Sequence, residues 1–175
     1  MTKESELLVQ TERISSIFAN IITTTAEKAL YETLGRNEMT LPQFRAMRYI
    51  ARHGSCTIGK LAEGLSISQP AATMTAERMV RKGLIERRTG DDRRQSKVYL
   101  TKHGRDLLDK VESERTRKLS QIIAALRPEG CVELLASLEG FVSAALEYIP
   151  AKDACLCCGQ EHVPECVVSR ARRKL

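Results

Sequence analysis

Four of the chain's six cysteines and one of its three histidines lie within the twelve residues CLCCGQEHVPEC, at positions 155–166. Thiolate and imidazole groups are the ligands that a structural zinc ion prefers, and the ion takes four of them in a tetrahedron. A Cys3His set with short loops is supplied by Cys155, Cys158, His162 and Cys166. The spacing therefore predicts a closed zinc site near the end of the chain.

Other ligand chemistry remains open for the same cluster. An iron–sulfur cluster prefers four thiolates, and these would be Cys155, Cys157, Cys158 and Cys166. The adjacent thiols of Cys157 and Cys158 would also suit a redox or metalloid switch. A third alternative is a disordered, partly oxidised tail, because residues 150–175 carry only scattered hydrophobic side chains. Structural zinc contributes on the order of 10 kcal/mol to folding such a peptide, which favours a zinc site over the alternatives. The site could be structural, or it could sense metal or oxidant.

Positive charge is concentrated in two parts of a chain whose net charge is +6. Residues 68–101 carry eight Lys and Arg against four Asp and Glu, and residues 167–175 carry four basic residues and no acid. Focused positive charge is typical of proteins that bind polyanions, because each contacted phosphate releases a counterion. We therefore expect a nucleic acid as the partner, with a solvated basic face as the alternative.

The residues in the first basic region have the spacing of two short helices joined by a tight turn. The first is expected over residues 58–64. The second is expected over residues 69–82, because Ser68 is a good N-cap and Pro70 suits a first turn. Its inward positions are predicted to be Ala72, Ala76, Met79 and Val80. This is the pattern of a helix-turn-helix, whose second helix enters the major groove of DNA.

Two short strands are predicted directly after that second helix, at residues 84–88 and 97–101. They flank the loop RTGDDRRQSK, in which paired acids are followed by paired arginines. A hairpin with a basic tip behind a helix-turn-helix makes a winged helix.

Long helices with apolar stripes surround this unit, and they are predicted at residues 5–34, 41–53, 102–125 and 129–149. A domain this small cannot easily bury the stripes of the outer helices by itself. We therefore expect a homodimer built from the terminal helices, with a monomeric bundle as the alternative.

The predicted fold is mainly α. A winged helix-turn-helix domain at residues 41–101 is flanked by helical dimerisation regions at residues 1–40 and 102–149. A Cys-rich basic tail follows at residues 150–175.

Three runs, in this order, resemble the MarR family of bacterial transcriptional regulators. They are LPQFRAMRYIARHG, IGKLAEGLSISQPAATMTAERMVRKGLIERR and GDDRRQSKVYLTKHGRDLL, and the resemblance covers about residues 8–149. It implies a homodimer that presents two recognition helices to the major groove of a pseudo-palindromic operator in double-stranded DNA, with a wing in each adjacent minor groove. It also implies a repressor that releases DNA when a small anionic or phenolic effector binds.

The resemblance also implies which residues contact DNA. It places base and phosphate contacts at Ser68, Gln69, Ala71, Thr73, Thr75 and Arg78. It places wing contacts at Asp92, Arg93 and Arg94, with one arginine in the minor groove and the aspartate orienting it. It implies that the effector binds in a crevice lined by Phe18, Ile21, Arg45, Met47, Arg48 and Tyr49.

The chemistry of these residue types agrees with such roles. Free N–H groups and the positive dipole end at the start of a helix attract phosphate. Gln69 suits adenine, and the methyl group of Ala71 or Thr73 suits a thymine methyl. Arginine suits a narrow minor groove.

Composition argues against other classes of protein. No apolar run approaches the roughly 20 residues that span a bilayer, and the first residues do not resemble a signal peptide, so a cytoplasmic location away from membranes is expected. No His or Asp is placed to activate Cys157 as a nucleophile, so the chain is not expected to be an enzyme. Cys56 and Cys131 are expected to be small buried hydrophobic residues.

Overall fold

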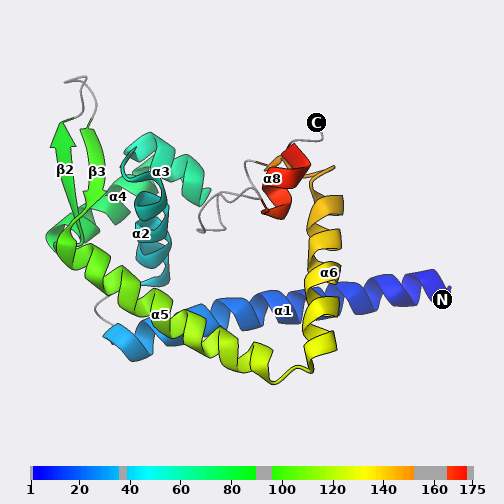
Figure 1. Cartoon of the computed structure of the whole chain (residues 1–175). Helices are drawn as coiled ribbons and strands as arrows, with labels where there is room; N and C mark the ends of the chain where they lie inside the picture. The colour runs from blue at the N-terminus through cyan, green and yellow to red at the C-terminus, as the bar shows by residue number, and fades with distance from the viewer. Residues whose placement is uncertain (1, 36–38, 90–95, 152–164, 173–175) are drawn as a thin grey trace.

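The computed structural model describes residues 2–35, 39–89, 96–151 and 165–172 of the chain. Its elements are α1 (Lys3–Leu34), α2 (Leu41–His53), β1 (Cys56–Thr57), α3 (Ile58–Leu65), α4 (Gln69–Arg81), β2 (Ile85–Thr89), β3 (Ser96–Leu100), α5 (Lys102–Ala124), α6 (Pro128–Ala145) and α8 (Val167–Arg172). The elements from α2 to β3 gather at one end of the molecule, and α1, α5 and α6 extend away from them (Figure 1). The predicted mainly α fold with a winged helix-turn-helix is confirmed.

We call the unit from α2 to β3 the head. Its small sheet has the strand order β1-β3-β2, and both pairings are antiparallel. The hairpin of β2 and β3 pairs Ile85 with Leu100 at its base and Thr89 with Ser96 at its far end. Both strands were predicted to within one residue. Their pairing carries the end of the hairpin away from α5 (Figure 1).

Each helix of the head starts at a residue whose side chain caps it. At α2, the Thr40 hydroxyl accepts a hydrogen bond from the Gln43 N–H, and the Gln43 side chain accepts one from the Thr40 N–H. The side chains of Thr57 and Ser68 cap α3 and α4 in the same way. Gly83 follows α4 at φ 67°, in the left-handed region that favours glycine. These local signals explain why the sequence predicted the helix boundaries closely.

One hydrophobic core holds the head together. Its largest fully buried side chains on α2 and α4 are Phe44, Met47, Ile50 and Met79. Side chains from α1 and α5 complete the same core, namely Leu30, Leu108 and Val111. The head is therefore packed rigidly against one end of the long helices.

The base of the hairpin is joined to the start of α5. The Thr101 hydroxyl donates to the Gly83 carbonyl at 2.6 Å and accepts from the Gly104 N–H at 2.9 Å. A Cβ at Gly104 would collide with the backbone carbonyl of Leu84, so only glycine permits this close approach. The junction fixes the direction of the wing relative to α5.

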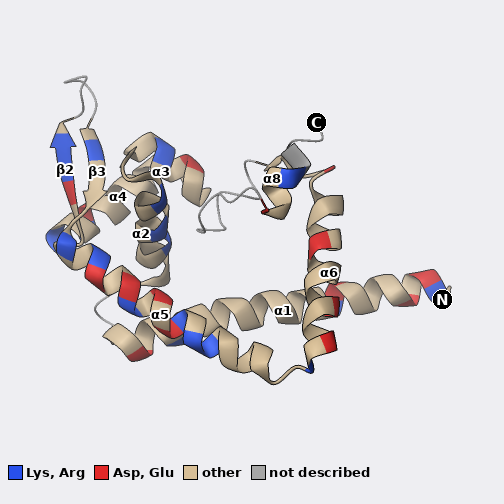
Figure 2. Ribbon diagram, in the orientation of Figure 1, with Lys and Arg blue, Asp and Glu red and all other residues tan. Residues whose placement is uncertain are grey.

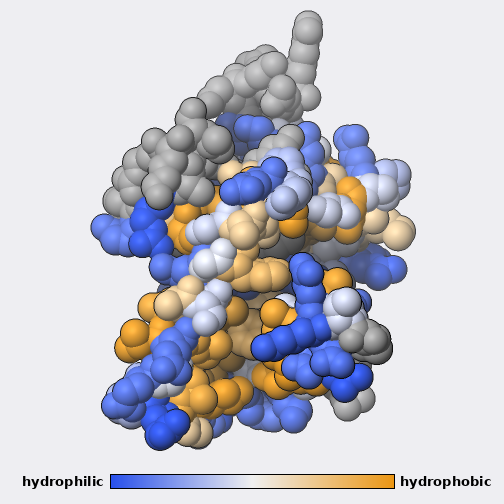
Figure 3. All heavy atoms as spheres, turned by 90° about the vertical axis from the view of Figure 1, so that its right-hand side faces the viewer, coloured by the Kyte–Doolittle hydropathy of each residue, from blue (hydrophilic) through white to orange (hydrophobic). Residues whose placement is uncertain are grey.

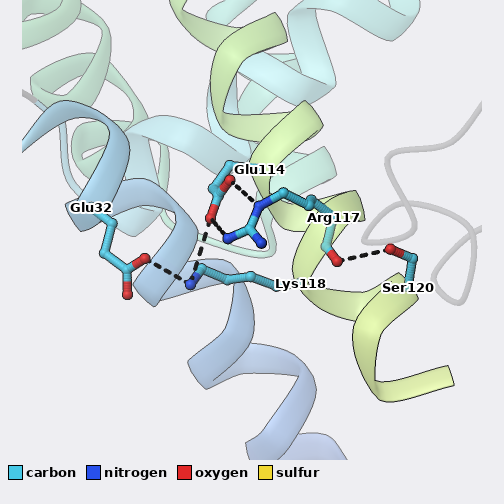
Figure 4. Close-up of polar contacts among 5 residues, drawn as sticks. All are labelled: Glu32, Glu114, Arg117, Lys118 and Ser120. Carbon is cyan, nitrogen blue, oxygen red and sulfur yellow. Dashed lines mark hydrogen bonds and ion pairs between the residues drawn. The ribbon is translucent and has the colours of Figure 1, made fainter. Parts of the chain in front are cut away.

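A polar network joins α1 to α5 (Figure 4). The Lys118 ammonium lies 2.7 Å from the Glu32 carboxylate and 3.5 Å from that of Glu114. The Arg117 guanidinium donates to Glu114 at 2.7 and 2.8 Å, and the Ser120 hydroxyl donates to the Arg117 carbonyl. The hydrogen bond from Arg117 is the main cause that lowers the pKa of Glu114 to about 2. The network aligns the two helices beyond the end of the core.

Residues 3–24 of α1 and residues 119–149, which hold the end of α5 and all of α6, form what we call the arms. The structure describes every residue of the arms and leaves each at least partly exposed. Their exposed large hydrophobic residues include Leu8, Ile14, Ile17, Leu135 and Phe141. The middle of α1 carries no charged residue (Figure 2). Hydrophobic residues gather on the face of the molecule that Figure 3 shows. The predicted apolar stripes on the outer helices are confirmed.

The short helix α8 packs against α6. Its Val168 side chain is buried, and the Arg170 guanidinium lies 2.8 Å from the Glu139 carboxylate of α6. Among the described residues, no helix is both long and apolar enough to cross a membrane.

Three expectations about local structure were wrong. Val80 was expected to face inward but is 37% exposed, because it lies about 100° around the helix from the fully buried Met79. The last predicted helix continues only to Ala145, and turns replace it before Pro150. Cys131 is half-buried rather than buried, whereas Cys56 is buried as predicted.

Candidate nucleic-acid interface

Helix α4 presents one side to the core and the opposite side to solvent. Its buried residues are Ala72, Ala76 and Met79. A repeat of 3.6 residues places Pro70, Met74 and Arg81 on the other side, and all three are exposed. A rigidly supported helix with one free side is what entry into a DNA groove requires.

The first turn of α4 is open to solvent. The Ser68 hydroxyl accepts a hydrogen bond from the Ala71 N–H at 3.4 Å, and Pro70 occupies a position whose missing N–H costs nothing. Ser68 and Gln69, two of the predicted DNA contacts, are both exposed here. This end carries the positive pole of the helix dipole, and the Gln69 N–H is the first-turn donor that the cap and the helix do not use, so the end attracts phosphate.

The two predicted threonine contacts use their hydroxyl groups within the helix. The Thr73 hydroxyl donates to the Gln69 carbonyl at 2.9 Å, and the Thr75 hydroxyl donates to the Ala71 carbonyl at 2.8 Å. Both threonines are half-buried, as is Ala71. The structure thus brings these predicted residues to the flanks of α4, and their hydroxyl protons are already committed.

Three arginines beside the free side of α4 have no acidic partner among the described residues. Arg78, Arg81 and Arg87 are exposed and form no ion pair there. Elsewhere each of the arginines Arg48, Arg115 and Arg117 lies against a carboxylate. The surface around α4 therefore keeps positive charge available for phosphates.

Arg81 lies between two shallow hollows. The first lies between α4 and β2 and is lined by Glu77, Val80, Arg81 and Arg87. The second lies between α4 and the start of α2 and is lined by Thr40, Gln43, Arg78, Arg81 and Lys82. Basic side chains thus border α4 on both sides of its second half.

Arg88 makes structural contacts in the described part of the wing. Arg88 forms an ion pair with Glu86, and its guanidinium lies 5.0 Å from the centre of the Tyr99 ring. Both contacts stiffen the hairpin. The predicted contacts at Asp92, Arg93 and Arg94 lie in residues 90–95, outside the described residues. What the structure fixes is where this loop begins and ends, at the paired residues Thr89 and Ser96.

A cavity of about 260 Å³ lies where α1, α2, α3 and α5 meet. Its apolar lining includes Ile22, Ala26, Leu41, Phe44 and Leu65. Three arginines also line it, namely Arg45, Arg48 and Arg115. Glu112 lies 2.5 Å from the Arg48 guanidinium and 2.8 Å from that of Arg115, so it joins α2 to α5 beside the cavity.

Only part of the predicted effector crevice lines this cavity. Arg45, Arg48 and Tyr49 do so, and burial raises the pKa of the Tyr49 phenol, which keeps it neutral. Met47 lies in the core instead. Phe18 and Ile21 lie on the arm and are exposed, because α1 turns its Ile22 side toward α2.

The structure describes Cys166 of the predicted zinc ligands. Cys155, Cys157, Cys158 and His162 fall in residues 152–164, outside the described residues. Cys166 is a free, half-buried thiol, and a backbone hydrogen bond from Ser169 is the main cause that lowers its pKa. By contrast, burial raises the pKa of the Cys56 thiol to about 11. Cys56 is therefore a core residue rather than a ligand.

Sequence reasoning missed three residues at these sites. Met74 and Arg87 lie on the exposed surface around α4, and the four-residue step from Pro70 to Met74 was a signal that would have found the first of them. Arg115 enters the cavity from α5, far along the chain, and no local pattern marked it.

Comparison with known sequences gives concordant findings. The sequence profile of the MarR family matches residues 38–95. The homoprotocatechuate degradative operon repressor of Escherichia coli is 30% identical over 109 residues, which are 62% of this chain and 74% of the repressor. The uncharacterized HTH-type transcriptional regulator YwhA of Bacillus subtilis is 29% identical over 118 residues, 63% of this chain and 85% of YwhA.

Solved structures share the fold. FabT of Streptococcus pneumoniae, solved in complex with DNA, superposes with a TM-score of 0.68 at 20% identity and covers 82% of this chain and 99% of its own. Similarity at this level of identity establishes the architecture. Residues 152–175 carry the predicted cysteine cluster and lie beyond the matched family profile.

Proposed function

This chain belongs to the MarR family of DNA-binding transcriptional regulators, and on this premise we propose that it is a homodimeric, sequence-specific repressor that responds to a small ligand. Its relatives are transcriptional regulators and not enzymes. The observation that carries the proposal is the free side of α4, supported on a packed core and bordered by arginines that form no ion pair within the described part of the chain.

In the proposed complex, α4 enters the major groove. The capped start of the helix binds a backbone phosphate, Gln69 reaches base edges, and Arg78 contacts the backbone. The hairpin directs its loop toward the adjacent minor groove, where Arg93 or Arg94 would bind. Each side chain named here was predicted from the sequence.

The arms support the dimer. Exposed large hydrophobic residues recur along both α1 and α6, and exposed apolar faces of this kind mark interaction surfaces. A twofold partner that covers them would place two copies of α4 on one face, as a pseudo-palindromic operator requires.

DNA binding is tested by fluorescence anisotropy with a duplex from the region upstream of the chain's own coding sequence. The logarithm of the binding constant should fall steeply and linearly with the logarithm of salt concentration. Arg94→Ala should weaken binding and reduce the slope by about one. Arg117→Ala is the matched control, because Arg117 is paired on α5 away from α4. Equal binding of this duplex and an unrelated one at every salt concentration would contradict specific recognition.

The ligand response is supported by the cavity at the junction of head and arms. Its apolar wall and its three arginines suit a small molecule with an apolar ring and an acidic group. A bound carboxylate would compete with Glu112 for Arg48 and Arg115, and so change how α2 is held against α5. That change would alter the spacing of the two α4 helices.

A matched pair of compounds tests this response. Small aromatic carboxylates should raise the melting temperature and weaken operator binding, whereas the corresponding amides should do neither. Arg48→Ala should abolish the difference between acid and amide. If acids and amides act alike on the wild-type protein, the arginines do not select the ligand. A reporter gene behind the operator then separates repression from activation.

We also propose that Cys155, Cys158, His162 and Cys166 hold a structural zinc ion. The donor set and its spacing support this, and Cys166, the member of the set that the structure describes, is a free thiol. Anaerobically purified protein should contain one zinc per chain, and His162→Ala should lose it. Iron in place of zinc would favour the iron–sulfur alternative. Operator binding before and after chelation then shows whether the site acts on DNA recognition.

A further inference from the structure

The head exposes few large hydrophobic side chains. Within its described residues only Ile67, Met74 and Val80 are exposed, and Met74 is the most open at 54%, against 37% for each of the other two. Every other large hydrophobic residue of the head lies at least partly inside. Because Met74 is the most exposed of the three, its side chain is available to whatever binds the free side of α4.

Met74 stands at the middle of the free side of α4. It lies one turn after Pro70 and about two turns before Arg81, and the buried Ala72 and Ala76 lie on the opposite side. It is therefore a long, exposed apolar side chain on the free side between the two ends of α4. The neighbouring Thr73 is half-buried and has its hydroxyl bonded to the helix.

The chemistry of the site favours DNA over a protein as the partner of Met74. A single apolar side chain is too small for a protein interface, which needs roughly 800 Å² from each partner. Arg78 and Arg81, without acidic partners among the described residues, lie one and two turns further along the same helix. A partner that meets one apolar group beside two cations on the same helix is best matched by a phosphate-bordered groove.

The major groove offers one apolar group that differs between bases, the C5-methyl of thymine. Met is unbranched and polarizable, so its thioether can adapt to such a methyl without a fixed hydrogen-bond geometry. We propose that Met74 is a specificity-determining residue that contacts a thymine methyl in each half-site of the operator. The inference rests on the proposed function, because it requires α4 to enter the major groove.

The test removes only the methyl group. The full-length protein first selects its preferred duplex from a random library, and each thymine of that duplex is then replaced by uracil. Wild-type protein should lose affinity about fourfold per half-site at one thymine, which is the effect of one buried methyl. Met74→Ala should bind more weakly than wild type and should show no loss at that position. Met74→Leu, which keeps an apolar side chain of similar size, should retain the loss.

Two further variants separate the contact of Met74 with a base from the binding of phosphates by the arginines. Met74→Gln should change the preferred base at that position toward adenine, which an amide can pair with at two atoms. Arg81→Ala should reduce the salt slope and leave the response to uracil unchanged. If Met74→Ala responds to uracil as wild type does, the inference is overturned while the proposed function stands. If the wild-type protein selects no sequence, the proposed function itself fails.

Discussion

Large hydrophobic residues are buried in the head but exposed on the arms. Phe44 in the head is 1% exposed, whereas Phe141 on α6 is 61% exposed. The head closes a core from α1, α2, α4, α5 and its sheet, but α6 has no buried residue. Both regions carry large hydrophobic residues on their helices, so the difference lies in what covers them. The core of the head is completed within one chain, and in the proposed dimer a second chain would cover the arms.

The stability of the arms should therefore depend on the protein concentration, whereas the stability of the head should not. Hydrophobic faces that only a partner covers contribute free energy only when the partner is bound. The core of the head contributes in every chain. The predictions below test this division, beginning with the largest expected effect.

Leu135→Glu should disrupt self-association. Leu135 is 61% exposed in a single chain, so a monomer would tolerate the change, but a dimer would bury a charge against an apolar surface twice. We expect a loss of about 3 kcal/mol per copy. Sedimentation velocity over a range of concentrations measures it.

The control for this variant is Ser137→Glu. Ser137 lies on the same helix, and its hydroxyl already donates to the Glu133 carbonyl on the polar side of α6. The Ser137→Glu variant should leave the dimer intact. If both variants sediment like the wild type, the arms are not the interface.

Phe44→Ala should destabilise the head by about 4 kcal/mol, because it leaves a cavity in a closed core. Chemical denaturation should give the same loss at low and high protein concentration. Phe141→Ala is the matched variant, and its effect should appear only where the dimer forms. A concentration-dependent loss for Phe44→Ala would mean that the core of the head is not closed within one chain.

Thr101→Val should cost about 1–2 kcal/mol, the usual cost of losing a helix cap. The Thr101 hydroxyl joins α5 to the turn at Gly83, so the loss should also weaken DNA binding through the wing. Thr11→Val in the arm is the control, since its hydroxyl only donates to the Leu7 carbonyl of its own helix. Equal melting temperatures for the two variants would show that the junction is not a stabilising contact.

The smallest effect is expected for Glu114→Gln, which removes a carboxylate from the polar network that joins α1 to α5. Its carboxyl pKa is lowered from 4.5 to about 2 in the folded chain, so the stabilisation is fully present above about pH 4.5 and is lost as the pH falls toward 2. The wild type should melt higher than the variant at pH 7, and the difference should vanish near pH 2. Glu12→Gln, at an exposed position of α1, is the control. A difference that persists unchanged to pH 2 would exclude the carboxylate as its source.

Apart from the short elements β1 and α8, the sequence alone determined the order and type of the elements from α1 to α6, because the signals for them are local. Thr40, Ser68 and Thr101 are side-chain caps, Gly83 is a stop, and hydrophobic spacing marked the buried side of each helix. It determined where positive charge gathers, and it named Ser68, Gln69 and Arg78, all of which the structure leaves exposed on α4.

Tertiary structure decided what depends on the meeting of distant segments. It rotated Val80 outward, a matter of helix orientation that a spacing of three or four residues leaves open. It brought Arg115 of α5 beside Arg45 and Arg48 of α2, and it kept Phe18 away from that cavity. Periodicity defines a face, but only packing decides what that face meets.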